Sequence, residues 1–288
     1  QKALTTTQLD GFSDKVDVIF PVLHGTFGED GTVQGFFDLL NLPYVGSGVL
    51  GSALGMDKII QKQLFSHHDI PIAPFIWFLR SQVQREALAV IKTIERFSRY
   101  PVFVKPANIG SSLGINKSHN RQELANHLVE ACLYDRKIII EQGLEGIREI
   151  EVSVLGNDNP KASVCGEIIS SNEFYDYDAK YIDGKSQAII PAKIPQRLSD
   201  DIRKTAVKVF KTLDCAGLGR VDFFVDRKLT KFWVNEINTI PGFTQISMYP
   251  KLWQASRVSY TELITKLIDL AVERWRDRQK IKVEYQPK

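Results

Sequence analysis

The chain has 288 residues, of which 43% are hydrophobic and 25% charged, and its formal net charge is +3. This composition is typical of a globular protein of two or three packed domains. The weak net charge argues against a nucleic-acid or anionic-membrane partner, and no apolar run approaches the ~20 residues of a membrane span. Cys132, Cys165 and Cys215 are far apart in the sequence and form no Cys-x-x-Cys pair. We therefore expect buried free thiols and a reducing, cytoplasmic compartment.

The first part of the chain predicts an α/β unit. Residues 16–20 form a short apolar run, expected to be a buried parallel strand. A glycine-rich segment (21–31) and a helix from about 32 to 40 follow, and residues 43–46 are expected to form the next strand. Strand, glycine loop and helix together form the layout of an anion or small-ligand site at a helix N-terminus. A plain turn is the more frequent interpretation of such a loop.

The next segments predict strands and helices around a second glycine-rich loop. Helices are expected at 58–67 and 82–97, and strands at 75–79 and 100–107. Residues 108–115 then read Asn-Ile-Gly-Ser-Ser-Leu-Gly-Ile, a loop rich in N–H and O–H donors that can close over phosphates. It is no Walker A loop, because it lacks the Gly-Lys-Ser/Thr ending and a following helix. A structural turn is the alternative.

Further along, alternation predicts antiparallel strands. A helix is expected at 120–134, and a strand at 137–143 that ends in polar residues. Residues 149–155 alternate like a half-exposed strand and should pair with 162–169 across the turn at 156–160. The long segment 170–191 interleaves aromatic and charged residues, which favours a functional lid. Amphipathic helices are expected at 196–213 and from 260 to about 276.

A predicted β-hairpin between residues 219 and 242 carries the strongest chemical signal. Two apolar runs flank a polar turn at 226–228. Arg220 and Asp222 lie two residues apart, so they share a strand face, as do Glu236 and Asn238. Carboxylate and amide oxygens suit Mg²⁺, which proteins hold with one or two carboxylates plus substrate phosphates. A solvated face of the hairpin is the alternative.

Several short motifs, in this order and spacing, resemble those of the D-alanine–D-alanine ligases of the ATP-grasp superfamily. They are His-Gly-x-x-Gly-Glu-Asp-Gly at 24–31, Met-Asp-Lys at 56–58, Val-Lys-Pro at 104–106, Gly-Ser-Ser-x-Gly at 110–114, Ala-Lys-Tyr at 179–181, Gly-Arg-Val-Asp at 219–222 and Asn-Glu-Ile-Asn-Thr-x-Pro-Gly at 235–242. The resemblance covers nearly the whole chain. It implies an α/β (α+β) ATP-grasp fold in which two α+β subdomains, 47–141 and 142–288, clamp ATP behind a partial α/β N-terminal domain, 1–46.

The resemblance also implies a reaction and a set of site residues. The reaction is ATP-dependent ligation of two D-alanines through an acyl phosphate, for peptidoglycan precursor synthesis, and the enzyme is expected to be a homodimer. The implied residues are Asp222, Glu236 and Asn238 for two Mg²⁺ (or Mn²⁺); Lys58, Lys105, Ser112, Glu141, Leu144 and Glu149 for ATP; His24, Ser247 and Met248 for D-alanine; and Arg220, Ser111, Tyr181, Lys180 and Gly242 for catalysis.

The expected lid helps to choose among substrates. By resemblance, Tyr181 is the tyrosine that closes over the site with Ser111 in D-alanine-specific enzymes. D-Alanine–D-lactate ligases carry histidine in this region, and none of the five histidines lies between residues 170 and 191. A neutral phenol does not repel the ammonium of an amino acid, so D-alanine is the predicted second substrate.

Two alternatives stay open at this stage. The chain could be another carboxylate–amine ligase of the superfamily, of D-Ala–D-Ser or D-Ala–D-lactate type, or an inactive nucleotide-binding chain. The second alternative rests on the N-terminus. The family normally begins with a βα unit that carries a Glu-His-x-Val-Ser pattern, and nothing in this sequence matches it. We therefore expect an N-terminally short chain with an incomplete pocket for the first substrate.

Overall fold

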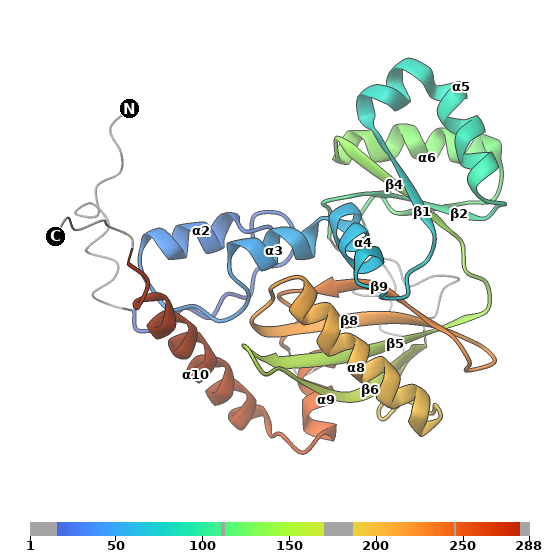
Figure 1. Cartoon of the computed structure of the whole chain (residues 1–288). Helices are drawn as coiled ribbons and strands as arrows, with labels where there is room; N and C mark the ends of the chain where they lie inside the picture. The colour runs from blue at the N-terminus through green and yellow to red at the C-terminus, as the bar shows by residue number, and fades with distance from the viewer. Residues whose placement is uncertain (1–15, 111–112, 170–186, 245, 283–288) are drawn as a thin grey trace, which may run out of the picture.

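Two antiparallel sheets organise the chain (Figure 1). The structure is a computed structural model that describes residues 16–110, 113–169, 187–244 and 246–282. The first sheet has the order β1 (Phe75–Leu79), β4 (Lys137–Gln142), β2 (Val102–Pro106) and β3 (Asn116–Ser118). The second has the order β7 (Gln187–Ile189), β6 (Lys161–Ile169), β5 (Ile147–Gly156), β8 (Gly217–Asp226) and β9 (Phe232–Asn238).

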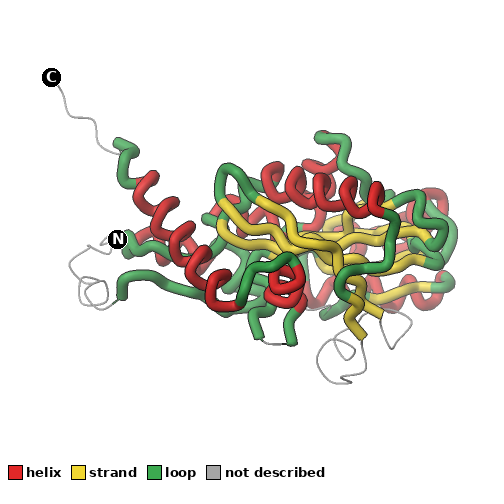
Figure 2. Tube along the Cα trace, turned by 90° about the horizontal axis from the view of Figure 1, so that it is seen from below, coloured by secondary structure: helices red, strands yellow, loops and turns green. Residues whose placement is uncertain are grey.

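Helices cover these sheets. In chain order they are α2 (Thr32–Leu39), α3 (Val49–Met56), α4 (Lys58–His67), α5 (Arg80–Phe97), α6 (Arg121–Tyr134), α8 (Gln196–Thr212), α9 (Met248–Ala255) and α10 (Tyr260–Arg278). In Figure 1, α5 and α6 lie on the outer side of the first sheet, and α4 lies below that sheet, toward the second. Seen from below, the strands form a layer with helices on both sides (Figure 2).

Alternation along the strands sorts the first sheet into an apolar face and a charged face. Val102, Val104, Ile138 and Ile140 pack with α5 and α6 in one buried cluster. Lys105 and Glu141 are offset from these residues by one position, so their side chains point to the opposite face. There Ile139 packs with Ile59 of α4 and with Ala107. The small sheet therefore presents its charged residues on the side of α4.

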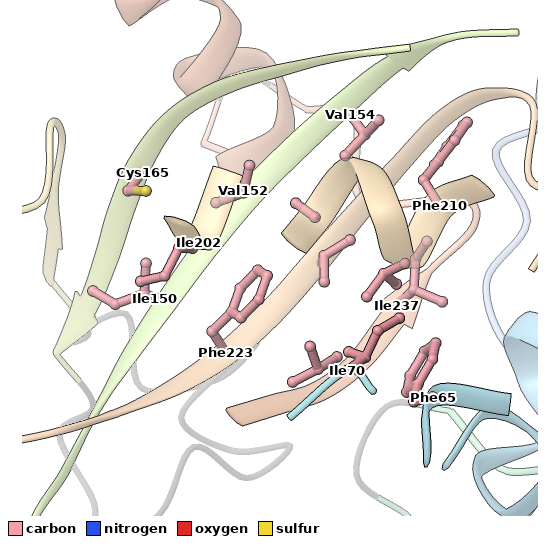
Figure 3. Packing of buried hydrophobic residues seen from close by; sticks show 14 of the residues in the cluster. Phe65, Ile70, Ile150, Val152, Val154, Cys165, Ile202, Phe210, Phe223 and Ile237 are labelled. Atoms are coloured by element: carbon pink, nitrogen blue, oxygen red, sulfur yellow. The ribbon is translucent and has the colours of Figure 1, made fainter. Parts of the chain in front are cut away.

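The same rule divides the second sheet. Ile150, Val152 and Val154 of β5 and Phe223 of β8 pack against Ile202 and Phe210 of α8, as Figure 3 shows. The opposite face meets α9 and α10 at one end, in a cluster formed by Leu155, Leu218, Tyr249, Trp253 and Leu263. The remainder of this face carries Glu151, Arg220 and Asp222. The large apolar core on the α8 side thus supports the strands that carry the polar residues.

Most predicted elements are confirmed, including the helix at 58–67, the 219–242 hairpin and the antiparallel pairing of 149–155 with 162–169. Three predictions are wrong. Residues 43–46, expected to form a strand, contain no strand, only the bridge residue Tyr44. Residues 16–20 form only a single parallel bridge, Ile19 to Tyr44, and are half-buried rather than buried. Strand β5 is buried along most of its length, not half-exposed, because it lies between β6 and β8 with helices on both faces. Its polar residues find partners inside: the Ser153 hydroxyl, for example, donates to the carbonyl of Tyr249, and the Ser153 N–H donates to Ser163 Oγ.

Two further observations concern the classes of protein considered above. All three cysteines are buried and free, as predicted. Among the residues that the structure describes, no helix has both the length and the apolar character required to cross a bilayer.

The core under the sheet gives a stability prediction. Phe210 of α8 is fully buried, so Phe210→Ala removes a large apolar side chain and leaves a cavity. We expect the free energy of unfolding to fall by about 3–5 kcal/mol in urea denaturation. Leu133→Ala on α6 is the matched control, because Leu133 is 76% exposed, and its loss should cost less than about 0.5 kcal/mol. Equal effects of the two substitutions would contradict this assignment of the core.

Candidate active site

A cleft lies between the charged faces of the two sheets. Its volume is about 860 Å³, which falls in the range of small-molecule sites. The first sheet contributes Phe103, Lys105 and Glu141 to its walls. The second sheet contributes Glu149, Glu151, Arg220, Asp222 and Glu236. Lysines on one wall thus face carboxylates on the other, an arrangement suited to a ligand that carries both phosphates and cations.

The strand register brings the predicted hairpin residues together. Arg220 pairs with Asn238 and Asp222 with Glu236, and Glu151 of β5 lies opposite Asp222 on its other side. Arg220 donates from Nε and Nη2 to the two oxygens of Asp222, each over 2.7 Å. Asn238 Nδ2 donates to Asp222 Oδ2 over 2.9 Å. Two hydrogen bonds from the Arg220 guanidinium and one from the Asn238 side-chain amide hold Asp222 in one orientation.

Arg220 remains a cation in this setting. Burial alone would lower its pKa, but Asp222 and Glu151 outweigh burial and raise the pKa of Arg220 above its usual range. Arg220 Nε lies 3.1 Å from Glu151 Oε2. With Glu236 included, three carboxylates surround one guanidinium. This wall therefore has an excess of negative charge, as a cation-binding wall requires.

The donor set fits a hard divalent cation. Asp222, Glu236 and Asn238 supply oxygen ligands at neighbouring register positions, and Mg²⁺ prefers such ligands. In the described residues no group of three or more His, Cys, Asp and Glu side chains is arranged to hold a metal ion. Proteins usually hold Mg²⁺ with one or two carboxylates and leave its other positions to water and substrate phosphates, which this donor set would allow.

A β-bulge in β9 adds a residue to the cleft. Asp222 pairs with Glu236, but the next residue, Phe223, pairs with Val234, so Asn235 is the extra residue. Regular alternation would turn Asn235 toward the core on the α8 side, whereas Asn235 Oδ1 lies 3.5 Å from Lys105 Nζ. Bulges frequently re-aim a side chain beside an active site. Here the bulge brings the hairpin into contact with the first sheet.

The opposite wall is built around a buried carboxylate. Lys105 Nζ donates to Glu141 Oε2 over 2.8 Å, and Lys62 Nζ of α4 lies 3.2 Å from Glu141 Oε1. Burial would raise the pKa of Glu141, but Lys105 and Lys62 outweigh burial and lower this pKa to about 2. Burial also lowers the pKa of Lys62, and Glu141 opposes that shift. Glu141 is therefore a carboxylate at any physiological pH.

Helix α4 positions Lys62 and a further lysine, Lys58. Its N-cap, Asp57, accepts from the N–H groups of Ile59 and Ile60 and forms an ion pair with Lys137 of β4. Lys58 donates to the carbonyl of Ile109 over 2.9 Å and lies 3.5 Å from Glu236 Oε2. The capped helix end is thus fixed to the first sheet while Lys58 reaches Glu236, one of the candidate metal ligands.

The first glycine-rich segment lies beside the end of the hairpin. His24 Nδ1 donates to the carbonyl of Ile240 over 2.9 Å. Glu29 accepts from the N–H groups of Gly25, over 2.7 Å, and Ile240, over 3.0 Å, and burial raises its pKa. A Cβ on Gly110 would lie 3.3 Å from Gly25 Cα. The two glycine-rich segments and the residues after β9 therefore meet at one place.

The remaining predicted residues have varied surroundings. Leu144 and Glu149 line the cleft. Gly242 leaves room for Ser247, because a Cβ at 242 would be 2.8 Å from Ser247 Oγ. The side chain of Met248 packs with Ile168 and Leu252 and is only 8% exposed. Four predicted residues lie outside the described part of the chain: Ser111, Ser112, Lys180 and Tyr181.

Four residues of the site were missed by sequence reasoning. Two had a recognisable signal. Lys62 is four residues after Lys58 and so lies on the same helix face, and Glu151 is two residues after Glu149 in an alternating strand. Glu29 stands within a motif that was noted but without a role of its own. Asn235 likewise stands in a noted motif, at 235–242, without a role of its own. Its contact with Lys105 had no local signal, because the bulge that turns it follows from the pairing of β8 with β9.

Comparison with known proteins places these features in a family. Residues 64–269 match the family model described as "D-ala D-ala ligase C-terminus", and residues 1–47 match "D-ala D-ala ligase N-terminus". The chain is 56% identical over 268 residues to a D-alanine–D-alanine ligase of Acetivibrio thermocellus, covering 93% of this chain and 71% of that protein. It is 51% identical over 280 residues to that of Natranaerobius thermophilus, covering 96% and 76%.

Solved structures agree. The D-alanine–D-alanine ligase from Coxiella burnetii matches with a TM-score of 0.80 and 37% identity, over 92% of this chain and 70% of that one. The VanG D-Ala:D-Ser ligase from Enterococcus faecalis matches with a TM-score of 0.80 and 39% identity, over 89% and 73%. The chain belongs to the D-alanine–D-alanine ligase family, and its ATP-grasp α+β fold is that of these neighbours.

The buried carboxylate gives a pH prediction. In the unfolded chain a glutamate takes up its proton near pH 4.5, whereas in the folded protein Glu141 does so near pH 2. Its contribution to stability is therefore present above pH 4.5 and is lost as the pH falls toward 2. In ¹³C NMR of glutamate-labelled protein, the Glu141 carboxyl signal should not shift between about pH 7 and pH 4. In the Lys105→Met variant the pH at the midpoint of the Glu141 titration should be higher, because one of its two cations is gone. A midpoint near 4.5 in the unchanged protein would contradict the buried ion pairs.

Proposed function

We propose that this chain joins two D-alanine molecules to D-alanyl-D-alanine at the expense of ATP, through an acyl phosphate, and so supplies a peptidoglycan precursor. One observation carries the proposal: the lysine wall of the cleft faces a wall that holds Asp222, Glu236 and Asn238 in register. Activating a carboxylate requires transfer of a phosphoryl group to it. Such transfer depends on alignment and charge neutralisation more than on covalent help from the protein.

The lysine wall holds the nucleotide. Lys58 and Lys105 contact its phosphates as point charges. Glu141 and Leu144, which both line the cleft, border the adenine, and Glu149 holds the ribose. Glu141 is ionised and accepts hydrogen bonds only, so it suits a base that presents an amino group at this position.

The hairpin wall holds the cations and the reacting carboxylate. Asp222, Glu236 and Asn238 are the ligands for Mg²⁺, which neutralises phosphate oxygens when bound. Arg220, locked by Asp222 and Glu151, faces the tetrahedral intermediate together with the backbone N–H of Gly242. Donors that are already oriented in the resting protein stabilise a developing oxyanion at no cost of reorganisation.

The two D-alanines bind near the end of the hairpin. His24, held against Ile240, borders the first one, and Ser247 receives the carboxylate of the second. We assign Met248 a backbone contact, because its side chain packs in an apolar cluster. Ser111, Ser112, Lys180 and Tyr181 keep their predicted roles, at the phosphates and in closing the site. They lie outside the described residues.

The metal assignment predicts a specific loss of activity. Asp222→Asn removes a carboxylate from the cation wall and loosens Arg220, so kcat should fall by about 10²–10³-fold or more, with little change in thermal unfolding. Dipeptide formation and phosphate release from ATP, Mg²⁺ and D-alanine measure this. Asp277→Asn on the exposed part of α10 is the control and should behave like the unchanged protein. Full activity of Asp222→Asn would refute the assignment.

The second substrate is tested by competition, because one solved neighbour is named a D-Ala:D-Ser ligase. The purified chain is given ATP, Mg²⁺ and D-alanine with an equal concentration of D-serine or D-lactate at neutral pH. D-Alanyl-D-alanine should be the main product, since the predicted lid carries no histidine. A larger yield of the D-serine or D-lactate product would assign another acceptor. ATP binding without phosphate release would favour an inactive nucleotide-binding chain.

A further inference from the structure

One buried lysine has no part in the mechanism above. We propose that Lys62 is a positioning residue, which holds Glu141 on the side away from the cleft so that Lys105 is available to the phosphates of the nucleotide. The inference rests on the proposed function in one respect, namely that Lys105 contacts phosphate.

Lys62 acts from behind the wall of the cleft. Its side chain is 2% exposed, compared with 4% for Glu141 and 9% for Lys105. Lys105 and Glu141 line the cleft, whereas Lys62 is absent from the described residues that line it. Lys62 is therefore not placed to touch a ligand in the cleft. Any influence on binding must pass through Glu141, its ion-pair partner at 3.2 Å.

The two lysines approach different oxygens of the same carboxylate. Lys105 Nζ makes a hydrogen bond of 2.8 Å to Oε2, while Lys62 Nζ faces Oε1. Among the described residues Lys62 Nζ has no hydrogen bond of good geometry, so the contact with Glu141 is an ion pair held by charge and burial. Each carboxylate oxygen thus has its own cation.

Counting charges shows what the arrangement achieves. Burial disfavours a charged Lys62, and Glu141 at 3.2 Å favours it; with both lysines protonated, Lys62, Lys105 and Glu141 together carry one net positive charge, in a setting where water screens little. If Lys105 turns to a phosphate, Glu141 still has a cation beside it. Without Lys62, Lys105 and Glu141 would form a neutral pair. A phosphate would then have to compete with a buried carboxylate that contacts no other cation among the described residues. Taking Lys105 away from such a carboxylate is strongly unfavourable.

Helix α4 carries both Lys62 and Lys58, the other lysine proposed to contact phosphate. Lys58 and Lys62 are four residues apart on α4, so they point to the same side. Lys58 reaches toward Glu236 and the carbonyl of Ile109, and Lys62 reaches Glu141. The N-cap Asp57, paired with Lys137 of β4, fixes the start of the helix to the strand that carries Glu141. A shift of α4 would therefore move both lysines together.

The test uses the full chain and inorganic tripolyphosphate, which has phosphates but no base, in isothermal titration calorimetry. Lys62→Met should weaken tripolyphosphate and ATP by about tenfold or more. The double variant Lys62→Met/Glu141→Gln should recover tripolyphosphate affinity to within about threefold of the unchanged protein, because a neutral glutamine no longer holds Lys105. A purely structural lysine would give a double variant that binds no better than Lys62→Met. That result, or unchanged affinity in Lys62→Met, overturns the inference.

Two controls separate this inference from the proposed function. Lys105→Met should lose tripolyphosphate affinity whether or not Lys62 is present. If it binds like the unchanged protein, the phosphate role of Lys105 is wrong. If it binds weakly while Lys62→Met binds normally, only the role of Lys62 is wrong. Should Lys62→Met fail to fold, Glu141→Gln is compared with the double variant, in which neutral residues replace a buried ion pair. These two should agree within about threefold, and a tenfold difference would overturn the inference.

Discussion

Charge buried between the two sheets must be paired, and this constraint governs both walls of the cleft. An isolated ion in a protein interior costs several kcal/mol even after relaxation. Glu141 is accordingly flanked by Lys62 and Lys105, and Arg220 by Asp222 and Glu151. Each pairing leaves a residual charge, positive on the lysine wall and negative on the hairpin wall. Phosphates and divalent cations are the ligands that complete such a site, so the same charges that must be balanced within the protein define what the cleft binds.

The apolar cores carry the stability that these polar walls do not supply. Buried ion pairs contribute little net stability, because desolvation offsets their attraction. The α8 cluster, with Phe210 and Phe223 at its centre, and the α5–α6 cluster lie on the outer faces of the two sheets. Strand alternation then assigns the inner faces to chemistry. Strand β5 shows the principle: Val152 points into the α8 core, while Glu151 points to Arg220.

Segments distant in the sequence complete the site at the end of the hairpin. Glu29 bonds to the N–H groups of both Gly25 and Ile240, and His24 bonds to the carbonyl of Ile240. The glycine-rich segment at 21–31 is thereby tied to the residues that follow Glu236 and Asn238, the candidate metal ligands of β9. Displacing one would disturb the other. In the proposed function both D-alanine binding and alignment of the phosphoryl group use this junction, so the two are expected to depend on one another.

The sequence by itself determined the local parts of this protein. Local sequence located the helices at 58–67, 82–97, 120–134 and 196–213, and amphipathic periodicity indicated those at 82–97 and 196–213. Alternation around a polar turn placed Arg220, Asp222, Glu236 and Asn238 on one face of a hairpin, and the motifs identified the family. These features depend on neighbours a few residues away. What the described structure adds depends on long-range contacts. Lys105 meets Asn235 from 130 residues away, and Lys62 of α4 meets Glu141 of β4. Strand β5 is buried because strands and helices from elsewhere cover it. No local pattern specifies those partners, because the packing of the whole chain decides which faces meet.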